Sequence, residues 1–257
     1  MDKLVFNDLM DKGIVTMVGL DPEKFTFADL EDYGYATSIY SDDVYNEAVK
    51  KLVNIEEATA KFLEDIKNGG DVVVPCDLTL DAPLVISKNT TVDLNGCTIS
   101  STQDVFEVTG EKLTINGNGL VHAATDNTCS WCAVFAHGNS VVEINGGEYK
   151  VGAPAGDYND LIYAKDNAVI TVNGGKFYID GTVRENDGVS FMINLKDKTA
   201  AKIEVKGGMF EKTNPAVAKT EPSGDYNFVA DGFESVQDGD WYVVRPVAEI
   251  VVDDITE

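Results

Sequence analysis

Arginine is nearly absent from this chain, which has only Arg184 and Arg245 among its 257 residues. Acidic residues outnumber basic ones, with 44 Asp and Glu against 20 Lys and Arg, so the formal net charge is -24 at pH 7. A field of that sign repels nucleic acids and anionic membrane surfaces, and the scarcity of arginine argues against phosphate recognition. We therefore expect no nucleic-acid partner, and the acidity equally suits plain colloidal solubility.

Long apolar runs and dense cysteine patterns are also missing. No segment approaches the roughly 20 apolar residues of a membrane-spanning helix, so no membrane insertion is expected. The first residues lack a basic region followed by an apolar one, which predicts no signal peptide. Four cysteines are too few for a disulfide-stapled scaffold. Together these features predict a protein made in a cytosol and stable without crosslinks.

The strongest pattern that is present is a repeated strand-and-turn unit. Each copy has an alternating β segment followed by Asn-Gly, or by Lys-Gly in the last copy. The copies are TVDLNGCTIS (91–100), KLTINGNGLV (112–121), VVEINGGEYK (141–150), VITVNGGKFY (169–178) and KIEVKGGMFE (202–211). The turn residues Asn95, Asn116, Asn145 and Asn173 are 21, 29 and 28 residues apart, and Lys206 follows after 33. A period of this size is typical of stacked repeats.

A second apolar segment precedes each turn by eight to eleven residues, at 105–108, 133–136, 161–164 and 192–195. This offset predicts coils of two strands joined by a short corner, with longer loops at 121–132, 150–160 and 178–190. The fold class is then mainly β, a short right-handed parallel β-helix of about five coils over residues 71–227. Independent Asn-Gly hairpins are the alternative interpretation.

Stacked corners predict a ladder of side chains. Equivalent residues of neighbouring coils lie about 4.8 Å apart, so amides in one column can hydrogen-bond to one another. The predicted structural ladder is Asn95, Asn116, Asn145 and Asn173. The aromatic residues after the corners, Tyr149, Phe177 and Phe210, are best explained by stacking within the core.

Segments of different character flank the repeats. Residues 1–41 carry short apolar clusters that follow no period. They predict an N-terminal arm that needs another surface to pack against. Residues 42–67 predict a helix that ends at Asn68-Gly69-Gly70, giving a second region over 42–70. Its apolar stripe fits either a cap on the first coil or a seam between copies of the chain. Residues 228–257 predict a closing hairpin and a tail.

No residue set in the chain matches a known catalytic, cofactor or metal pattern. Cys129 and Cys132 with His122 and His137 could hold zinc, but packed thiols fit the spacing better. Acidic loops at 157–160 and 185–188 match no calcium-loop pattern. We therefore predict no catalytic residue, no cofactor and no resident metal.

The Leu-Asn-Gly, Ile-Asn-Gly and Val-Asn-Gly corners and the coil period resemble the pectate-lyase-like right-handed β-helix superfamily across residues 71–227. This resemblance implies the architecture and not the activity. Lyases of that group typically use an Arg or Lys base beside clustered calcium-binding Asp residues, and no position here matches one.

The short coils followed by FVADGFESVQDGDWYVVRP (228–246) look like modules of bacteriophage fibre and appendage proteins and of bacterial surface proteins. The resemblance implies a structural virion protein, a fibre or capsid decoration, with a head fibre favoured over a tail fibre. It would be a homotrimer made in the host cytoplasm and exposed on the particle exterior, where it adheres to host or glycan surfaces.

In this interpretation the arm binds capsid or other virion proteins. Its candidate anchor residues are Leu4, Phe6, Ile14, Val15, Phe25 and Phe27. Two alternatives remain open. One is a polysaccharide depolymerase or lyase with a site between chains, and the other is a bacterial surface adhesin.

Overall fold

A computed structural model describes residues 42–124, 132–153, 159–181, 190–222 and 225–248 of the chain. The predicted arm, with its six anchor residues, and the tail from residue 249 lie outside these ranges. The chain divides into two compact units, residues 1–61 and 62–257, and each is considered by itself.

The second unit is built from three sheets, mainly of parallel strands. Sheet A contains β1 (Gly70–Val73), β4 (Thr90–Asp93), β7 (Lys112–Asn116), β10 (Val141–Ile144), β13 (Val169–Val172) and β16 (Lys202–Val205). Sheet B contains β2 (Leu78–Leu80), β5 (Thr98–Ser101), β8 (Leu120–Ala123), β11 (Glu148–Ala153), β14 (Lys176–Gly181), β17 (Gly208–Glu211), β21 (Trp241–Pro246) and β20 (Phe233–Asp238). Sheet C contains β3 (Leu84–Ile86), β6 (Phe106–Thr109), β9 (Val134–His137), β12 (Asn159–Ala164) and β15 (Ser190–Leu195).

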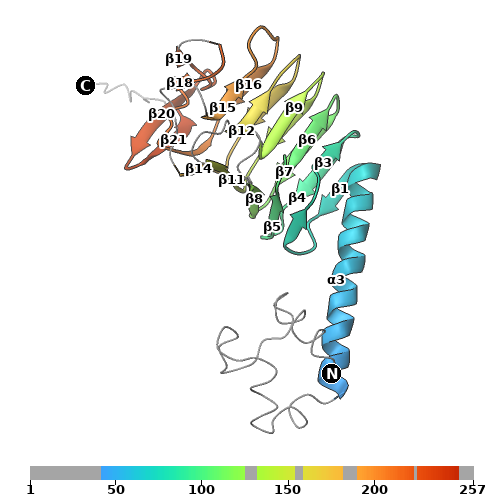
Figure 1. The fold of residues 1–257 in the computed structure, drawn as a ribbon. Coiled ribbons are helices and arrows are strands. Elements are labelled where there is room, and N and C mark those ends of the chain that lie inside the picture. Colours follow the sequence, from blue (N-terminus) through green and yellow to red (C-terminus); the bar gives the residue numbers. More distant parts are fainter. Residues whose placement is uncertain (1–41, 125–131, 154–158, 182–189, 223–224, 249–257) are drawn as a thin grey trace, which may run out of the picture. The chain divides into compact units, whose positions relative to one another are not determined.

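The chain enters sheets A, B and C in turn, so three successive strands form a triplet with one strand in each sheet (Figure 1). Each sheet therefore takes every third strand, from β1 to β17, and pairs it in parallel with its neighbour. The prediction of two strands per coil is wrong. The short segment after each corner is itself a strand. It pairs with residues in neighbouring triplets, so the sequence of a single repeat does not reveal it.

The core is made by the inward-facing residues of the alternating strands. On sheet A, Val92, Ile115 and Ile144 are register partners and are fully buried. The same column continues through Val172 to Val205. Stacking β-branched and aliphatic side chains in register gives a continuous apolar interior, and burial of such surface is the main favourable term in folding.

An aromatic column runs through the interior under sheet B. Tyr149, Phe177 and Phe210 are fully buried, and their rings are parallel, with centroids 5.0 and 4.7 Å apart. The hydroxyl of Tyr149 donates a hydrogen bond to the carbonyl of Gly146 at 2.9 Å, which satisfies its one polar atom. These residues belong to the core, as the sequence predicts.

The helix α3 (Asp42–Asn68) matches the predicted helix over 42–67 and crosses the boundary between the two units. Within the second unit, Phe62 and Ile66 in its last turns are buried in the hydrophobic core. The helix ends where the amide of Gly69, at φ +76°, donates to the carbonyl of Asp65.

The other end of the second unit is closed by an antiparallel hairpin. Strands β20 and β21 meet at Gly239, and β21 pairs antiparallel with β17, the last parallel strand of sheet B. This matches the predicted hairpin. A short ladder of β18 (Ala218–Lys219) and β19 (Asp225–Tyr226) precedes it and was not predicted.

Candidate functional site

Three of the four predicted ladder residues form a hydrogen-bonded column at the end of the sheet A strands. The amide of Asn145 donates to the side-chain oxygen of Asn116 at 2.8 Å, and Asn173 donates to Asn145 at the same distance. In register the next residue is Lys206, whose ammonium instead lies 3.3 Å from Glu204. The ladder is a structural feature that joins three triplets.

Asn95 does not belong to this column, contrary to the prediction. The register places Asp93 beside Asn116, and the amide of Asn95 donates to the backbone carbonyl of Val74 at 3.1 Å. Asn95 and Gly96 have φ values of +51° and +75°, and the amide of Cys97 donates back to the carbonyl of Leu94. This turn is longer than the others. An alignment of Asn95-Gly96 with Asn116-Gly117 therefore differs by two residues from the observed pairing of Asp93 with Asn116.

A second amide pair was missed by sequence reasoning. The side chain of Asn167 donates to that of Asn139 at 2.9 Å in the turns between sheets C and A. The signal in the sequence is a repeat of Asn at a spacing of 28 residues, the same spacing that separates Asn145 from Asn173.

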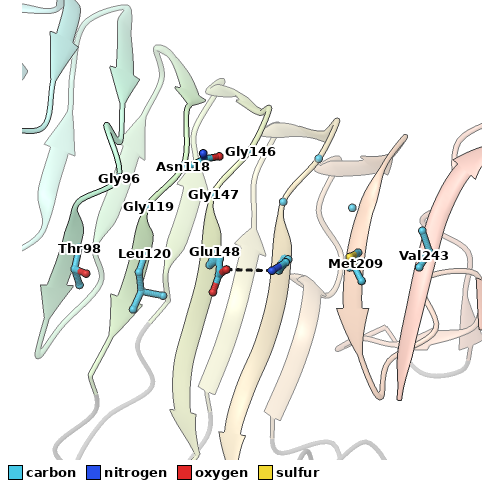
Figure 2. A pocket seen from close by; sticks show the side chains of 14 residues that line it. Gly96, Thr98, Asn118, Gly119, Leu120, Gly146, Gly147, Glu148, Met209 and Val243 are labelled. Carbon is cyan, nitrogen blue, oxygen red and sulfur yellow. Dashed lines mark hydrogen bonds and ion pairs between the residues drawn. The ribbon is translucent and has the colours of Figure 1, made fainter. Parts of the chain in front are cut away.

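A shallow groove of about 770 Å³ runs along the corner between sheets A and B (Figure 2). Its floor is largely backbone, because glycines occupy the corners of successive triplets. A methyl group at Gly207 would lie 2.3 Å from the carbonyl oxygen of Asn173, so at that position only glycine lets the stacked corners approach.

Few charged groups reach this groove. Glu148 and Lys176 line it from neighbouring strands and form an ion pair at 3.3 Å, drawn as a dashed line in Figure 2. Both side chains are about half exposed, so the pair contributes little to stability. In the described part of the chain, the one carboxylate that lines the groove is paired with a lysine, and the floor consists of peptide groups. Within these residues the groove therefore offers no side chains arranged for acid–base catalysis.

A group of polar side chains surrounds Glu221 beside sheet C. Glu221 accepts hydrogen bonds on both carboxylate oxygens: Oε1 from Tyr163 and Asn194, and Oε2 from Lys196 and the amide of Asp197. Burial opposes ionisation of Glu221, but the hydrogen bonds from Lys196 and its neighbours outweigh it and lower the pKa. Glu221 therefore ties the segment before β19 to strand β15.

Two further carboxyl groups lie near this group. Asp104 is 9% exposed and accepts a hydrogen bond from the amide of Cys132 at 2.6 Å. Burial raises the pKa of Asp104 to about 6. Burial likewise raises the pKa of Asp160 to about 7, although a hydrogen bond with Asn194 favours its ionised form. At neutral pH these two positions therefore hold more protons than ordinary aspartates.

An aromatic pair stands on the outer surface of the same sheet. Phe135 and Tyr163 are register partners on β9 and β12, and their rings are nearly parallel with centroids 5.4 Å apart. The ammonium of Lys165 lies 4.9 Å from the Phe135 ring centroid, and His137 contacts Glu107 at 3.1 Å. The sequence predicted only the buried aromatic column and not this partly buried pair.

The thiol and imidazole groups considered for zinc do not come together in the part of the chain that is described. Cys132 is buried beside Asp104, and His137 pairs with Glu107. Among the residues that the structure describes, no group of three His, Cys, Asp or Glu side chains is arranged to hold a metal ion. Cys129 lies outside the described residues.

Comparison with known proteins gives no assignment. No protein-family model, curated protein or solved structure matches this chain. Among the described residues, no helix combines the length and the hydrophobicity needed to cross a bilayer.

Proposed function

We propose that residues 71–227 form a right-handed parallel β-helix of the pectate-lyase-like type with about five coils. Support comes from the strand order, in which every sheet takes each third strand in parallel register. A crossover between parallel strands is right-handed in nearly all proteins, which gives the hand of the coil.

On this scaffold we propose a structural role in a bacteriophage particle, as a head fibre or another fibre or decoration protein. The observation that carries it is the mechanical continuity of the second unit. Each triplet is joined to the next by three parallel ladders and a common apolar core, with the Asn116–Asn145–Asn173 ladder on its surface. Such a stack is a rigid spacer, which suits a protein that holds a surface away from a particle.

The predicted roles of the flanking segments complete this proposal. Residues 1–41 dock to capsid or other virion proteins through their apolar clusters. The fibre is a homotrimer, and the exposed surface adheres to host or glycan surfaces. The high negative charge keeps many copies soluble at the crowded surface of a particle.

Docking can be tested in the full chain with paired substitutions. Phe25→Asp and Phe27→Asp place charges in the arm, while Val217→Asp changes a side chain that is 55% exposed in the second unit. Particles grown with each variant are purified and examined by proteomics and electron microscopy. The arm variants should be lost from particles and the Val217 variant retained. Equal retention of all three would contradict the anchor role, and absence of the unaltered protein from particles would contradict the whole proposal.

A second candidate, a polysaccharide depolymerase, is favoured by one observation. On sheet C the environment raises the pKa of Asp160 to about 7 and lowers that of Glu221, which separates an acid from a base as glycosidases require. Incubation with neutral and acidic polysaccharides tests it. Release of oligosaccharides that Asp160→Asn and Glu221→Gln both abolish would support this candidate, and no release from any substrate would remove it.

A further inference from the structure

Two of the cysteines occupy equivalent positions in neighbouring triplets. Leu78 pairs with Ile99 in parallel register, and extending this register by two residues places Cys76 beside Cys97. The influence of Cys76 on the pKa of the Cys97 thiol agrees with this placement. The backbone amide of Thr98 donates to the side-chain Oδ1 of Asp77 at 2.7 Å, which joins the two segments directly after the cysteines. The equivalent residue is glycine in the following three triplets and in the last layer, which is formed by β16 and β17: Gly119, Gly147, Gly175 and Gly208.

The two thiols share one environment. Both are partly buried and pack against the same hydrophobic core. Cys97 Sγ donates a weak hydrogen bond to the carbonyl of Val74 at 3.7 Å. Neighbouring strands are about 4.8 Å apart, which falls within the Cα separation of roughly 4.4–6.8 Å that disulfides span. Residues in register on neighbouring strands are therefore close enough to be joined by a disulfide.

We propose that Cys76 and Cys97 form a disulfide that joins the first triplet to the second under oxidising conditions. The oxidant is a small-molecule disulfide such as oxidised glutathione. The thiolate of one cysteine attacks it, forms a mixed disulfide and releases one glutathione thiolate. The second cysteine then attacks the mixed disulfide and releases the other. Two protein thiol protons pass to the two released thiolates, and the protein gains one S–S bond.

The crosslink acts at the first edge of the stack. Strands β1, β2 and β3 form the first triplet, and each pairs with a strand of its own sheet on one side only. A bond between positions 76 and 97 closes a loop in the chain that includes the end of this triplet. The loop lowers the conformational entropy of the unfolded state. The inference does not depend on the proposed virion role.

The test uses the full chain with oxidised glutathione as the probe. Burial and the nearby charges of Asp77 and Cys76 raise the pKa of the Cys97 thiol, so a mildly alkaline buffer is used. After alkylation of remaining thiols, non-reducing peptide mapping should find peptides of Cys76 and Cys97 linked, with a mass lower by two hydrogen atoms. The oxidised protein should melt at a higher temperature than the reduced one, and dithiothreitol should reverse the shift.

Cys76→Ser and Cys97→Ser are the matched variants. Each should abolish the linked peptide and the reversible rise in melting temperature, while circular dichroism shows that the fold persists. A lasting glutathione adduct on Cys76 or Cys97 in the unaltered protein would overturn the inference. So would a link between two chains, or oxidation confined to Cys129 and Cys132.

Discussion

The ring of Phe177 lies between those of Tyr149 and Phe210 and is parallel to the Phe210 ring within 11°, with centroids 4.7 Å apart. The side chain of Phe177 therefore joins three consecutive strands of sheet B, β11, β14 and β17. Phe177→Ala should lower the free energy of unfolding by about 3–5 kcal/mol, because it leaves a cavity and breaks both ring contacts. Denaturant unfolding measures this loss. Phe177→Leu fills most of the volume and should cost clearly less, and equal costs would contradict a central packing role.

The asparagine ladder predicts a graded effect. Asn145 donates to Asn116 and accepts from Asn173, whereas Asn139 accepts one amide hydrogen bond, from Asn167, among the described residues. Each hydrogen bond contributes about 0.5–1.5 kcal/mol, so Asn145→Ala should destabilise by roughly twice as much as Asn139→Ala. Chemical denaturation of the two variants gives the comparison. A smaller loss for Asn145→Ala would mean that solvent replaces the ladder without cost.

The stacked corners predict a steric effect at glycines that do not have positive φ. A Cβ at Gly207 would lie 2.3 Å from the Asn173 oxygen, while at Gly174 the nearest approach is 3.0 Å, to the Asn145 oxygen. Gly207→Ala should therefore destabilise by about 1–3 kcal/mol, and Gly174→Ala by less. Thermal unfolding ranks the two. The reverse order would show that the corner relaxes freely at Gly207.

The two aspartates with raised pKa values, Asp104 and Asp160, predict a dependence of stability on pH. The pKa of Asp160 is raised to about 7 and that of Asp104 to about 6, so the folded state binds more protons than the unfolded chain above about pH 4. Their contribution to stability is present at acidic pH and is lost as the pH rises through these values.

Asp160→Asn isolates this effect, because asparagine cannot ionise. The stability of the variant minus that of the unaltered protein should increase between pH 4 and pH 7 and level off above pH 7. Equilibrium unfolding at a series of pH values measures the difference. A constant difference would mean that Asp160 titrates normally.

Much of the fold follows from the periodicity of the sequence. The positions of sheets A and C, the helix before them and the closing hairpin could be predicted because apolar residues alternate at fixed offsets from the corners. The register between Asn95 and Asn116 could not be predicted, because the first Asn-Gly turn is longer than the others. Strand pairing depends on the length of the turn as well as on its motif. Nor could the strand after each corner be separated from the turn without its partners in the neighbouring triplets.

The candidate site was less predictable. Tyr163, Asn194 and Glu221 meet across 58 positions of sequence, and no local pattern links the segment before β19 to sheet C. The raised pKa of Asp160 depends on its burial in the folded chain. Such groups come together only through the tertiary fold, so composition and spacing carry no trace of them.

The constant register between β10 and β13 implies that the stack can be lengthened by whole layers. Val141 pairs with Val169 and Asn145 stacks on Asn173, so the segment from 141 to 168 begins and ends at equivalent positions. A second copy of that segment inserted after residue 168 would find matching partners on both sides. Each insertion should add one layer of about 4.8 Å to the stack, while the antiparallel β21 still terminates it.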